Sequence, residues 1–436
     1  MNKSLTIIGA GLAGSEAAWQ AAQRGIRVVL YEMRPKIPTP VHKSDQCAEL
    51  VCSNSLGSNL PGSAPSLLKE ELRNLQSLVI QAADHNAVPA GSALAVNREG
   101  FAKEITQAVV NHPNITLKRE EVAALPSARP LIIATGPLTS SRLSEEIARF
   151  LGQGYLYFYD ALSPIVDAAT IDYQKTFFAS RYNKGTADYL NCPMNKTQYR
   201  NFIHQLRNAD KVPLKSFEKP LYFEGCMPIE ELALRDEQTL AFGPLKPVGL
   251  PHPETGEQFH AVVQLRKENK EGTAYNLVGF QTKLTYPEQR KVFATIPGLE
   301  KAEFFRYGAI HRNTFINTPA LMTPSLSLRT HAGVYFAGQI VGVEGYVESC
   351  AMGAVAALSA VKSIKGEPFA PPPPQTAIGA LLGHVVEKKK GPYQPMNINF
   401  GLFLGNGVPV RDKKQRNRNI IQCALDTQSR WLAVNG

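Results

Sequence analysis

Residues 5–35, LTIIGAGLAGSEAAWQAAQRGIRVVLYEMRP, predict a strand, a tight turn, a helix and a second strand. The first residues are mostly apolar, as a parallel strand buried on both faces requires. Gly9, Gly11 and Gly14 match the pattern G-x-G-x-x-G, in which Gly11 lets the backbone approach a pyrophosphate at the helix N-terminus. Glu32 ends the second strand, at the distance expected for a carboxylate that accepts a ribose hydroxyl. The predicted dinucleotide site comprises Gly9, Ala10, Gly11, Leu12, Ala13, Gly14 and Glu32.

Two later stretches favour FAD over NAD as the dinucleotide. Residues 129–137, RPLIIATGP, predict another buried strand ending in A-T-G, and residues 332–361 predict a strand, a glycine turn and a long helix of small residues. Both resemble elements of two-dinucleotide-type flavoproteins, in which the long helix directs its N-terminus at the flavin pyrimidine ring. That pattern usually has Asp where this chain has Gln339, and a neutral amide can still bond to the cofactor. The alternative is an NAD-binding Rossmann domain followed by an unrelated strand and helix. We predict FAD, with Gly338, Gln339 and Tyr346 as further contacts.

The order of these elements predicts an α/β fold in which a two-dinucleotide-type FAD-binding Rossmann-like domain is interrupted by an inserted α/β domain. The nucleotide elements lie toward both ends of the chain, and breaker pairs at 136–137 and 297–298 mark the boundaries. We assign residues 1–137 and 304–436 to the FAD-binding domain and 138–303 to the insert. The insert sequence has no second G-x-G-x-x-G, so we expect any nicotinamide reductant to bind transiently.

Composition limits the class of protein. The 436 residues are 44% hydrophobic and 19% charged, which is ordinary for a globular chain long enough for two domains. The sequence has no apolar run of about 18 residues and no signal-peptide pattern at its N-terminus, so we expect no membrane partner. Six irregularly spaced cysteines indicate a reducing compartment, the cytoplasm, and we predict no metal site.

The net charge of +10, from 47 basic and 37 acidic residues, favours a polyanionic partner such as nucleic acid. Two basic clusters near the C-terminus support that interpretation: Lys388, Lys389 and Lys390, and then Arg411, Lys413, Lys414, Arg416 and Arg418. The alternative is a basic enzyme that binds no nucleic acid and whose charge clusters are solvated faces.

Cys47 and Cys52 have the C-x4-C spacing of flavin disulfide reductases, which makes such an oxidoreductase an alternative class. Those enzymes have a separate nicotinamide domain with its own glycine fingerprint and a C-terminal His-Pro pair, and this sequence has neither. Cys226 lies in LYFEGCMPIEEL, between a strand-like run and a predicted helix, where a helix N-terminus can stabilise a thiolate. We expect small buried side chains at Cys192, Cys350 and Cys423.

Several long blocks of the sequence carry a resemblance to a known family. They include AELVCSNSLGSN (48–59), YFEGCMPIEELA (222–233), IPGLEKAEFFRYGAIHRNTFINTP (296–319) and MNINFGLFLG (396–405). Over essentially its whole length the chain resembles the folate- and FAD-dependent tRNA (uracil-5-)-methyltransferases. The larger flavoproteins that modify the wobble uridine of tRNA share the N-terminal fingerprint and the IPGLE block, but they are substantially longer.

The resemblance implies a reaction and two catalytic residues, Cys226 and Cys52. A methylene carbon passes from 5,10-methylenetetrahydrofolate to C5 of a T-loop uridine in tRNA and is reduced to a methyl group, and NAD(P)H re-reduces the FAD. Addition of a thiolate to uracil C6 makes C5 nucleophilic, and we assign that attack to Cys226. Cys52 then removes the C5 proton or helps manage the methylene intermediate. Tyr346 is a candidate for stacking on flavin or folate, with ordinary packing as the alternative.

Further expectations follow from the same resemblance. His311, Arg312 and Asn313, within the block at 296–319, are expected to line the site. Cys47 stands where the family usually has a large apolar residue, which suggests that its thiol is incidental. Gly57 replaces a usual basic residue, which puts a phosphate or folate contact there in doubt. The same chemistry on a uridine of ribosomal RNA, and a non-catalytic flavin-containing RNA-binding or assembly factor, are the open alternatives.

Overall fold

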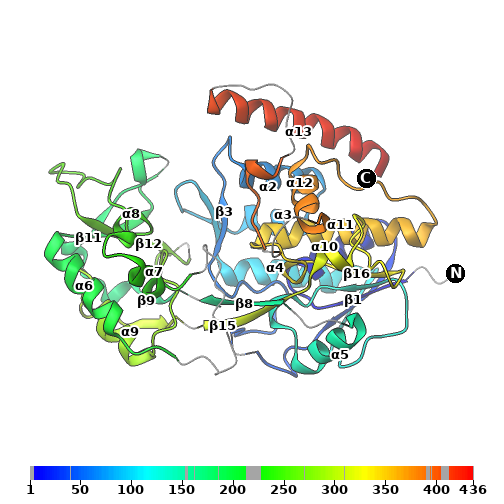
Figure 1. Cartoon of the computed structure of the whole chain (residues 1–436), viewed down its shortest axis with the longest axis horizontal. Coiled ribbons are helices and arrows are strands. Elements are labelled where there is room, and N and C mark those ends of the chain that lie inside the picture. Colours follow the sequence, from blue (N-terminus) through cyan, green and yellow to red (C-terminus); the bar gives the residue numbers. More distant parts are fainter. Residues whose placement is uncertain are drawn as a thin grey trace.

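The computed structural model of the chain (Figure 1) describes residues 4–39, 41–152, 156–161, 163–184, 186–212, 227–269, 271–308, 310–388, 393, 395–403 and 412–435. Over these residues the protein is an α/β structure with two larger sheets, one parallel and one antiparallel. The α/β class is the one that the sequence predicts.

The parallel sheet has five strands in the order β16-β7-β1-β2-β6. Its strands are β1 (Ser4–Ile8), β2 (Arg27–Glu32), β6 (Ile115–Arg119), β7 (Leu131–Ile133) and β16 (Val334–Phe336). All three residues of β7 are 0% exposed, because this inner strand is covered on both faces. β16 comes from late in the sequence and pairs with β7, so early and late segments of the chain share one sheet, as predicted.

Two helices of small residues, α1 (Leu12–Gln23) and α11 (Tyr346–Lys365), pack directly against each other in the core of this part. Ala17, Ala18 and Ala21 of α1 are 0% exposed, and so is Ala354 of α11. Among the described residues, α11 is the one helix long and apolar enough to cross a membrane, but 83% of that stretch is buried inside the protein. Its apolar composition therefore matches its position in the core.

The remaining elements of this part surround the sheet and the helix pair. They are β3 (Ser55–Ser58), α2 (Ala64–Asn74), α3 (Leu78–His85), β4 (Ala87–Val88), β5 (Ala93–Val96), α4 (Arg98–Asn111), α5 (Ser141–Leu151), α10 (Thr318–Leu321), α12 (Ala377–Val386) and α13 (Lys413–Asn435). Figure 1 shows α13, in red, lying across α2 and α12. The Gln428 side chain of α13 bonds to Asn74 and to the Glu71 carbonyl oxygen, which fastens α13 to α2.

The antiparallel sheet has six strands in the order β10-β11-β12-β13-β9-β14 and lies at the left of Figure 1. Its strands are β9 (Ile165–Asp167), β10 (Phe177–Phe178), β11 (Tyr189–Met194), β12 (Ala261–Lys267), β13 (Ala274–Leu277) and β14 (Phe304–Arg306), and its helices are α6 (Lys196–Asn208), α7 (Ile229–Arg235), α8 (Thr239–Phe242) and α9 (Tyr286–Phe293). Phe202, Leu265 and Phe280 belong to a buried apolar cluster that is separate from the core of the parallel sheet.

A two-stranded ribbon, β8 (Leu156–Ala161) paired with β15 (Ile310–Phe315), lies between the two larger sheets (Figure 1). Helix α5 precedes this ribbon, and its Leu143 and Ile147 belong to the core of the parallel sheet. Val166 is the first residue along the chain that belongs to the second core. The chain therefore passes from one core to the other along the segment that includes β8.

Candidate active site at the carboxyl ends of the parallel strands

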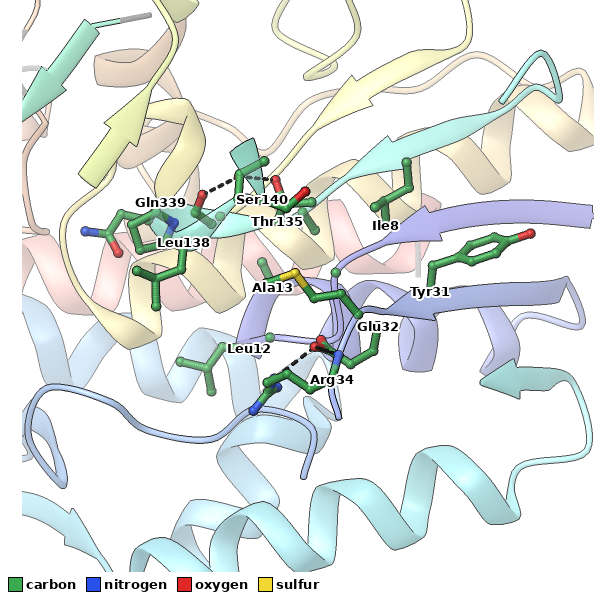
Figure 2. A pocket seen from close by; sticks show the side chains of 18 of the residues that line it. Ile8, Leu12, Ala13, Tyr31, Glu32, Arg34, Thr135, Leu138, Ser140 and Gln339 are labelled. Carbon is green, nitrogen blue, oxygen red and sulfur yellow. Dashed lines mark hydrogen bonds and ion pairs between the residues drawn. The ribbon is translucent and has the colours of Figure 1, made fainter. Parts of the chain in front are cut away.

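A cleft with an empty volume of about 1000 Å³ lies at the carboxyl ends of the parallel strands. Figure 2 shows side chains from β1, β2 and the segment after β7 arranged around it. Parallel α/β sheets bind ligands at this edge. Eight of the predicted cofactor contacts line the cleft: Gly9, Gly11, Leu12, Ala13, Glu32, Gly338, Gln339 and Tyr346. The other two, Ala10 and Gly14, support the glycine turn through their backbone atoms.

The glycine turn between β1 and α1 has the shape that a pyrophosphate requires. Gly9 has φ +97°, and a Cβ on Gly14 would lie 1.7 Å from the Gly9 carbonyl oxygen, so both positions need glycine. A Cβ on Gly11 would meet nothing within 4 Å, which leaves open space in front of the helix. Gly11 caps α1 without a side-chain hydrogen bond, so the first helical amides can bind an anion. These features fit the pyrophosphate of FAD.

Glu32 is held as an anion beside the cleft (Figure 2). Its Oε2 accepts a hydrogen bond from the Ala10 amide at 3.1 Å, and its Oε1 accepts one from Arg34 Nε at 2.9 Å. Burial alone would raise the pKa of Glu32, but the Arg34 charge and these hydrogen bonds outweigh it and lower the pKa below its usual value. An ionised carboxylate retains lone pairs for a ribose hydroxyl, so the geometry fits the predicted contact.

The turn after β16 and the N-terminus of α11 line another part of the cleft. Gly338 has φ +83°, and a Cβ there would lie 2.7 Å from the Ala13 Cβ, so this turn fits closely against α1. Gln339 and Tyr346 line the cleft, and α11 begins at Tyr346 with no side-chain cap from Gly345. Two helix N-termini therefore meet one cleft, an arrangement that suits a long cofactor with a pyrophosphate and a polar ring edge.

Cys52 lies next to the N-terminus of α11. Its amide donates a hydrogen bond to the Tyr346 hydroxyl at 2.8 Å, across 294 residues of sequence. Cys52 is half-buried, whereas Cys47 is 0% exposed and its amide bonds to the Thr106 hydroxyl. Burial raises the pKa of the Cys47 thiol above its usual value. The structure thus bonds the Cys52 backbone to a residue that lines the cleft, whereas Cys47 lies in the core.

Several predicted residues fall in parts that the structure does not describe. Cys226 lies outside the described residues, so its distance from Cys52 stays open, and Lys389, Lys390 and Arg411 lie outside them as well. The backbone of His311, Arg312 and Asn313 forms part of β15 and pairs with β8, but the side chains of these three residues lie outside the described part. Their predicted role at the site remains a prediction.

The remaining cysteines agree with the prediction in two cases out of three. Cys192 and Cys350 are 0% exposed, and burial raises the pKa of the Cys350 thiol well above its usual value. Cys423 was expected to be buried and is only half-buried. The reason is that α13 turns Ala424 and Trp431 toward the core, which leaves Cys423 at the edge of the buried face.

Sequence reasoning missed several residues of the cleft. Arg34, His42, Glu49, Glu120 and Ser140 all line it. Burial and the neighbouring Arg34 charge lower the pKa of His42 to about 4, so this ring is neutral at physiological pH. Arg34 follows Glu32 by two residues and could have been found as its local partner. The others lie in loops and at a helix start with no motif of their own.

The parallel sheet, the glycine turn, the ionised Glu32 and the uncapped helix ends define an FAD-binding protein with a Rossmann-like fold. Residues 4–368 match the model of the family described as "Glucose inhibited division protein A", and the chain belongs to this family.

Two relatives named "Methylenetetrahydrofolate--tRNA-(uracil-5-)-methyltransferase TrmFO" match the chain over nearly all its length. The protein from Heliobacterium modesticaldum is 56% identical over 432 residues, which cover 99% of this chain and 98% of the relative. The protein from Bacillus subtilis is 52% identical over 425 residues, or 98% of each chain. These relatives confirm the resemblance found in the sequence.

Among solved structures, Aquifex aeolicus GidA in its form II crystal matches with a TM-score of 0.72 at 17% identity. The match covers 98% of this chain and 73% of that chain. At this identity the similarity concerns the fold alone, and it agrees with the FAD-binding Rossmann-like architecture.

Proposed function

We propose that this chain methylates C5 of a uridine in tRNA, with 5,10-methylenetetrahydrofolate as the one-carbon donor and FAD as its bound cofactor. The observation that carries the proposal is the half-buried Cys52, whose amide bonds to the hydroxyl of Tyr346, a residue of the FAD cleft. A thiol held beside a flavin site is what a reaction that joins a reduction to pyrimidine chemistry needs. The name of the two relatives supports the same reaction.

Bound FAD supplies the hydride that reduces the transferred carbon to a methyl group. The residues of the chain hold and orient the reactants. The amides at the start of α1 would bind the pyrophosphate, Glu32 would accept a hydrogen bond from a ribose hydroxyl, and Gln339 would offer its amide to the ring edge. Tyr346 fixes the backbone of Cys52 through its hydroxyl group, so that the thiol lies beside the reacting atoms.

The two thiols divide the chemistry on the pyrimidine. We assign to Cys226 the attack on uracil C6, in which a sulfur–carbon bond forms and the electrons of the C5–C6 double bond move toward O4. C5 can then bond to the electrophilic one-carbon unit. The Cys52 thiolate removes the C5 proton, and the bond between the transferred carbon and the folate nitrogen breaks, so that tetrahydrofolate leaves with that electron pair and a methylene group remains on C5. Addition of a hydride to this methylene makes the methyl group, and the bond between Cys226 and C6 breaks as the C5–C6 double bond re-forms. Atoms and electrons balance with one folate-borne carbon and one hydride for each uridine.

Finer parts of the proposal rest on the family resemblance and on composition. They are a T-loop uridine as the target, a nicotinamide reductant that binds transiently, and an inserted α/β domain at 138–303 that interrupts the FAD-binding domain. A second buried core between Val166 and Leu299 supports an insert of about this extent. The irregular spacing of the six cysteines supports a reducing compartment, and we place the enzyme in the cytoplasm without a membrane partner.

The test is ribothymidine formation by the purified protein on unmodified tRNA, with and without methylenetetrahydrofolate. We expect a flavin absorption spectrum and methylation only when the folate is present. Ribosomal RNA transcripts in the same assay distinguish the alternative target. Activity with S-adenosylmethionine in place of the folate would contradict the proposal.

Cysteine variants test the two assigned roles. Cys52→Ala should lower the methylation rate by at least about 100-fold, the usual size of a general-base contribution. Cys423→Ala, which removes a half-buried thiol on α13, is the matched control and should retain full activity. Methylation by Cys52→Ala at the wild-type rate would remove Cys52 from the mechanism. A covalent complex between Cys226→Ala and tRNA that carries 5-fluorouridine would do the same for the assigned attack.

A further inference from the structure

The segment that carries Cys52, residues 50–54 (the thiol segment), is fastened on two sides. On one side is the bond from the Cys52 amide to Tyr346 of α11. On the other side, Asn54 is 0% exposed and accepts a hydrogen bond from Arg266 of β12 at 3.1 Å. The Asn54 amide group also donates to the Lys267 carbonyl oxygen at 3.0 Å. The thiol segment therefore joins the FAD-binding helix to the antiparallel sheet.

Two arginines bind three consecutive carbonyl groups of the thiol segment. Arg98 donates from Nη1 to the Leu50 oxygen at 2.5 Å and from Nη2 to the Cys52 oxygen at 3.2 Å. Arg306 donates from Nη1 to the Val51 oxygen at 3.0 Å and from Nη2 to the Cys52 oxygen at 2.8 Å. Two planar guanidinium groups that converge on one short segment fix its backbone far more tightly than single donors would.

The two arginines that bind the thiol segment differ in how their charge is compensated. Arg98 pairs with Glu268, with Arg98 Nε 2.6 Å from Glu268 Oε2, and their side chains are 17% and 6% exposed. Among the described residues, no ion pair neutralises Arg306 and its buried Nε has no hydrogen-bond partner. The pKa of Arg306 is lowered, first by burial and then by the Arg98 charge, and the nearby Glu268, Cys52 and Tyr346 offset part of this shift. An anionic Cys52 and the Arg306 cation thus stabilise each other.

We propose that Arg98 and Arg306 are positioning residues for Cys52, which hold the thiol segment against the N-terminus of α11 and favour the thiolate form of the thiol. Arg98 begins α4 beside the parallel sheet, and Arg306 ends β14 of the antiparallel sheet. The thiol is therefore set in place only while these two parts are packed together. This inference rests on the proposed role of Cys52 and deepens it.

The experiment measures the reactivity of Cys52 in the full-length, FAD-loaded protein. Iodoacetamide is reacted from about pH 6 to about pH 9, and alkylation of Cys52 is followed by peptide mass spectrometry, which separates it from the other thiols. In Arg306→Met we expect alkylation of Cys52 at pH 7 to slow about tenfold. A nearby cation of this kind lowers the pKa of a thiol by about one unit, and the variant loses that effect. The kcat of methylation should fall about tenfold or more, with KM for tRNA within about twofold. Arg306→Lys restores the charge without the planar fork, so alkylation recovers while kcat stays low.

Two further variants separate electrostatics from a loss of folding. Glu268→Gln keeps the shape of the side chain and removes the carboxylate that pairs with Arg98. Cys52 should then be alkylated about threefold faster at pH 7, a change opposite to that in Arg306→Met. Arg200→Met removes an exposed arginine paired with Glu237 on a distant surface and is the matched control, with no change expected. Alkylation profiles of Arg306→Met and Glu268→Gln that superimpose on the wild type would overturn the inference. If instead Cys52→Ala methylates normally, the proposed function of Cys52 fails while the alkylation result still decides the role of the arginines.

Discussion

Replacing Gly353 with alanine tests the close packing that places two helix N-termini at one cleft. Gly353 lies in the buried part of α11, where a Cβ would come within 2.3 Å of the Ala13 carbonyl oxygen and within 2.9 Å of two further Ala13 backbone atoms. These are backbone atoms of α1, which cannot turn aside as a flexible side chain can. Helices α1 and α11 must therefore move apart in the variant.

The expected loss of stability is the difference between two effects. Alanine favours a helix over glycine by about 1 kcal/mol, so the change without a steric conflict would stabilise the protein. The 2.3 Å contact is about 1 Å shorter than ordinary van der Waals contact, which begins at 3.4 Å. Overpacking costs about 1–3 kcal/mol, and a backbone neighbour places this site at the upper end of that range. We expect a net loss of about 2 kcal/mol in the free energy of unfolding.

Urea unfolding followed by circular dichroism measures this loss, and flavin fluorescence measures FAD affinity, which should weaken about tenfold as the N-terminus of α11 shifts. The matched control is Gly383→Ala in α12, where a Cβ would meet only the flexible Glu387 carboxylate at 3.6 Å. That variant should be as stable as the wild type or more stable by up to about 1 kcal/mol. A Gly353→Ala protein that matches Gly383→Ala in both measurements would refute the packing argument.

Two further predictions concern buried carboxylates. Glu32→Gln leaves Arg34, which is 3% exposed, without its nearest counter-charge. The flavin content of the variant should therefore fall, and its free energy of unfolding should drop by about 3 kcal/mol. Urea unfolding with and without FAD measures this loss. Burial raises the pKa of Glu348 to about 7 from a usual 4.5, so the folded state keeps a proton that the unfolded chain releases. Stability should therefore fall by about 3 kcal/mol as the pH rises from about 4.5 to about 7, and Glu348→Gln should lack this slope in urea midpoints taken at about pH 5 and pH 7.5.

The parts of the fold and site that sequence reasoning predicted have local causes. The strand, turn and helix around Gly9 and Gly14 depend on contacts between residues close in the chain, so the glycine motif was sufficient to predict them. The pairing of β16 with β7 is distant, but its buried apolar pattern and the glycine turn after it resemble known flavoproteins. No sequence pattern predicted which residues surround Cys52. Its partner Tyr346 lies 294 residues away and its partner Arg306 lies 254 residues away, and only the folded chain brings them together.

Cys47 and Cys52 lie five residues apart at the two ends of one short segment, and different contacts hold each end. Cys47 is 0% exposed, and the next residue, Ala48, has φ +53° and donates its amide to the Ala10 carbonyl oxygen of the glycine turn at 2.9 Å. That end of the segment is therefore built into the nucleotide site. The other end is held by Arg306 and Tyr346, which leave Cys52 half-buried. The two cysteines of the C-x4-C pattern thus lie at two anchoring points of one segment, and Cys52 is bonded through its amide to a residue that lines the cleft.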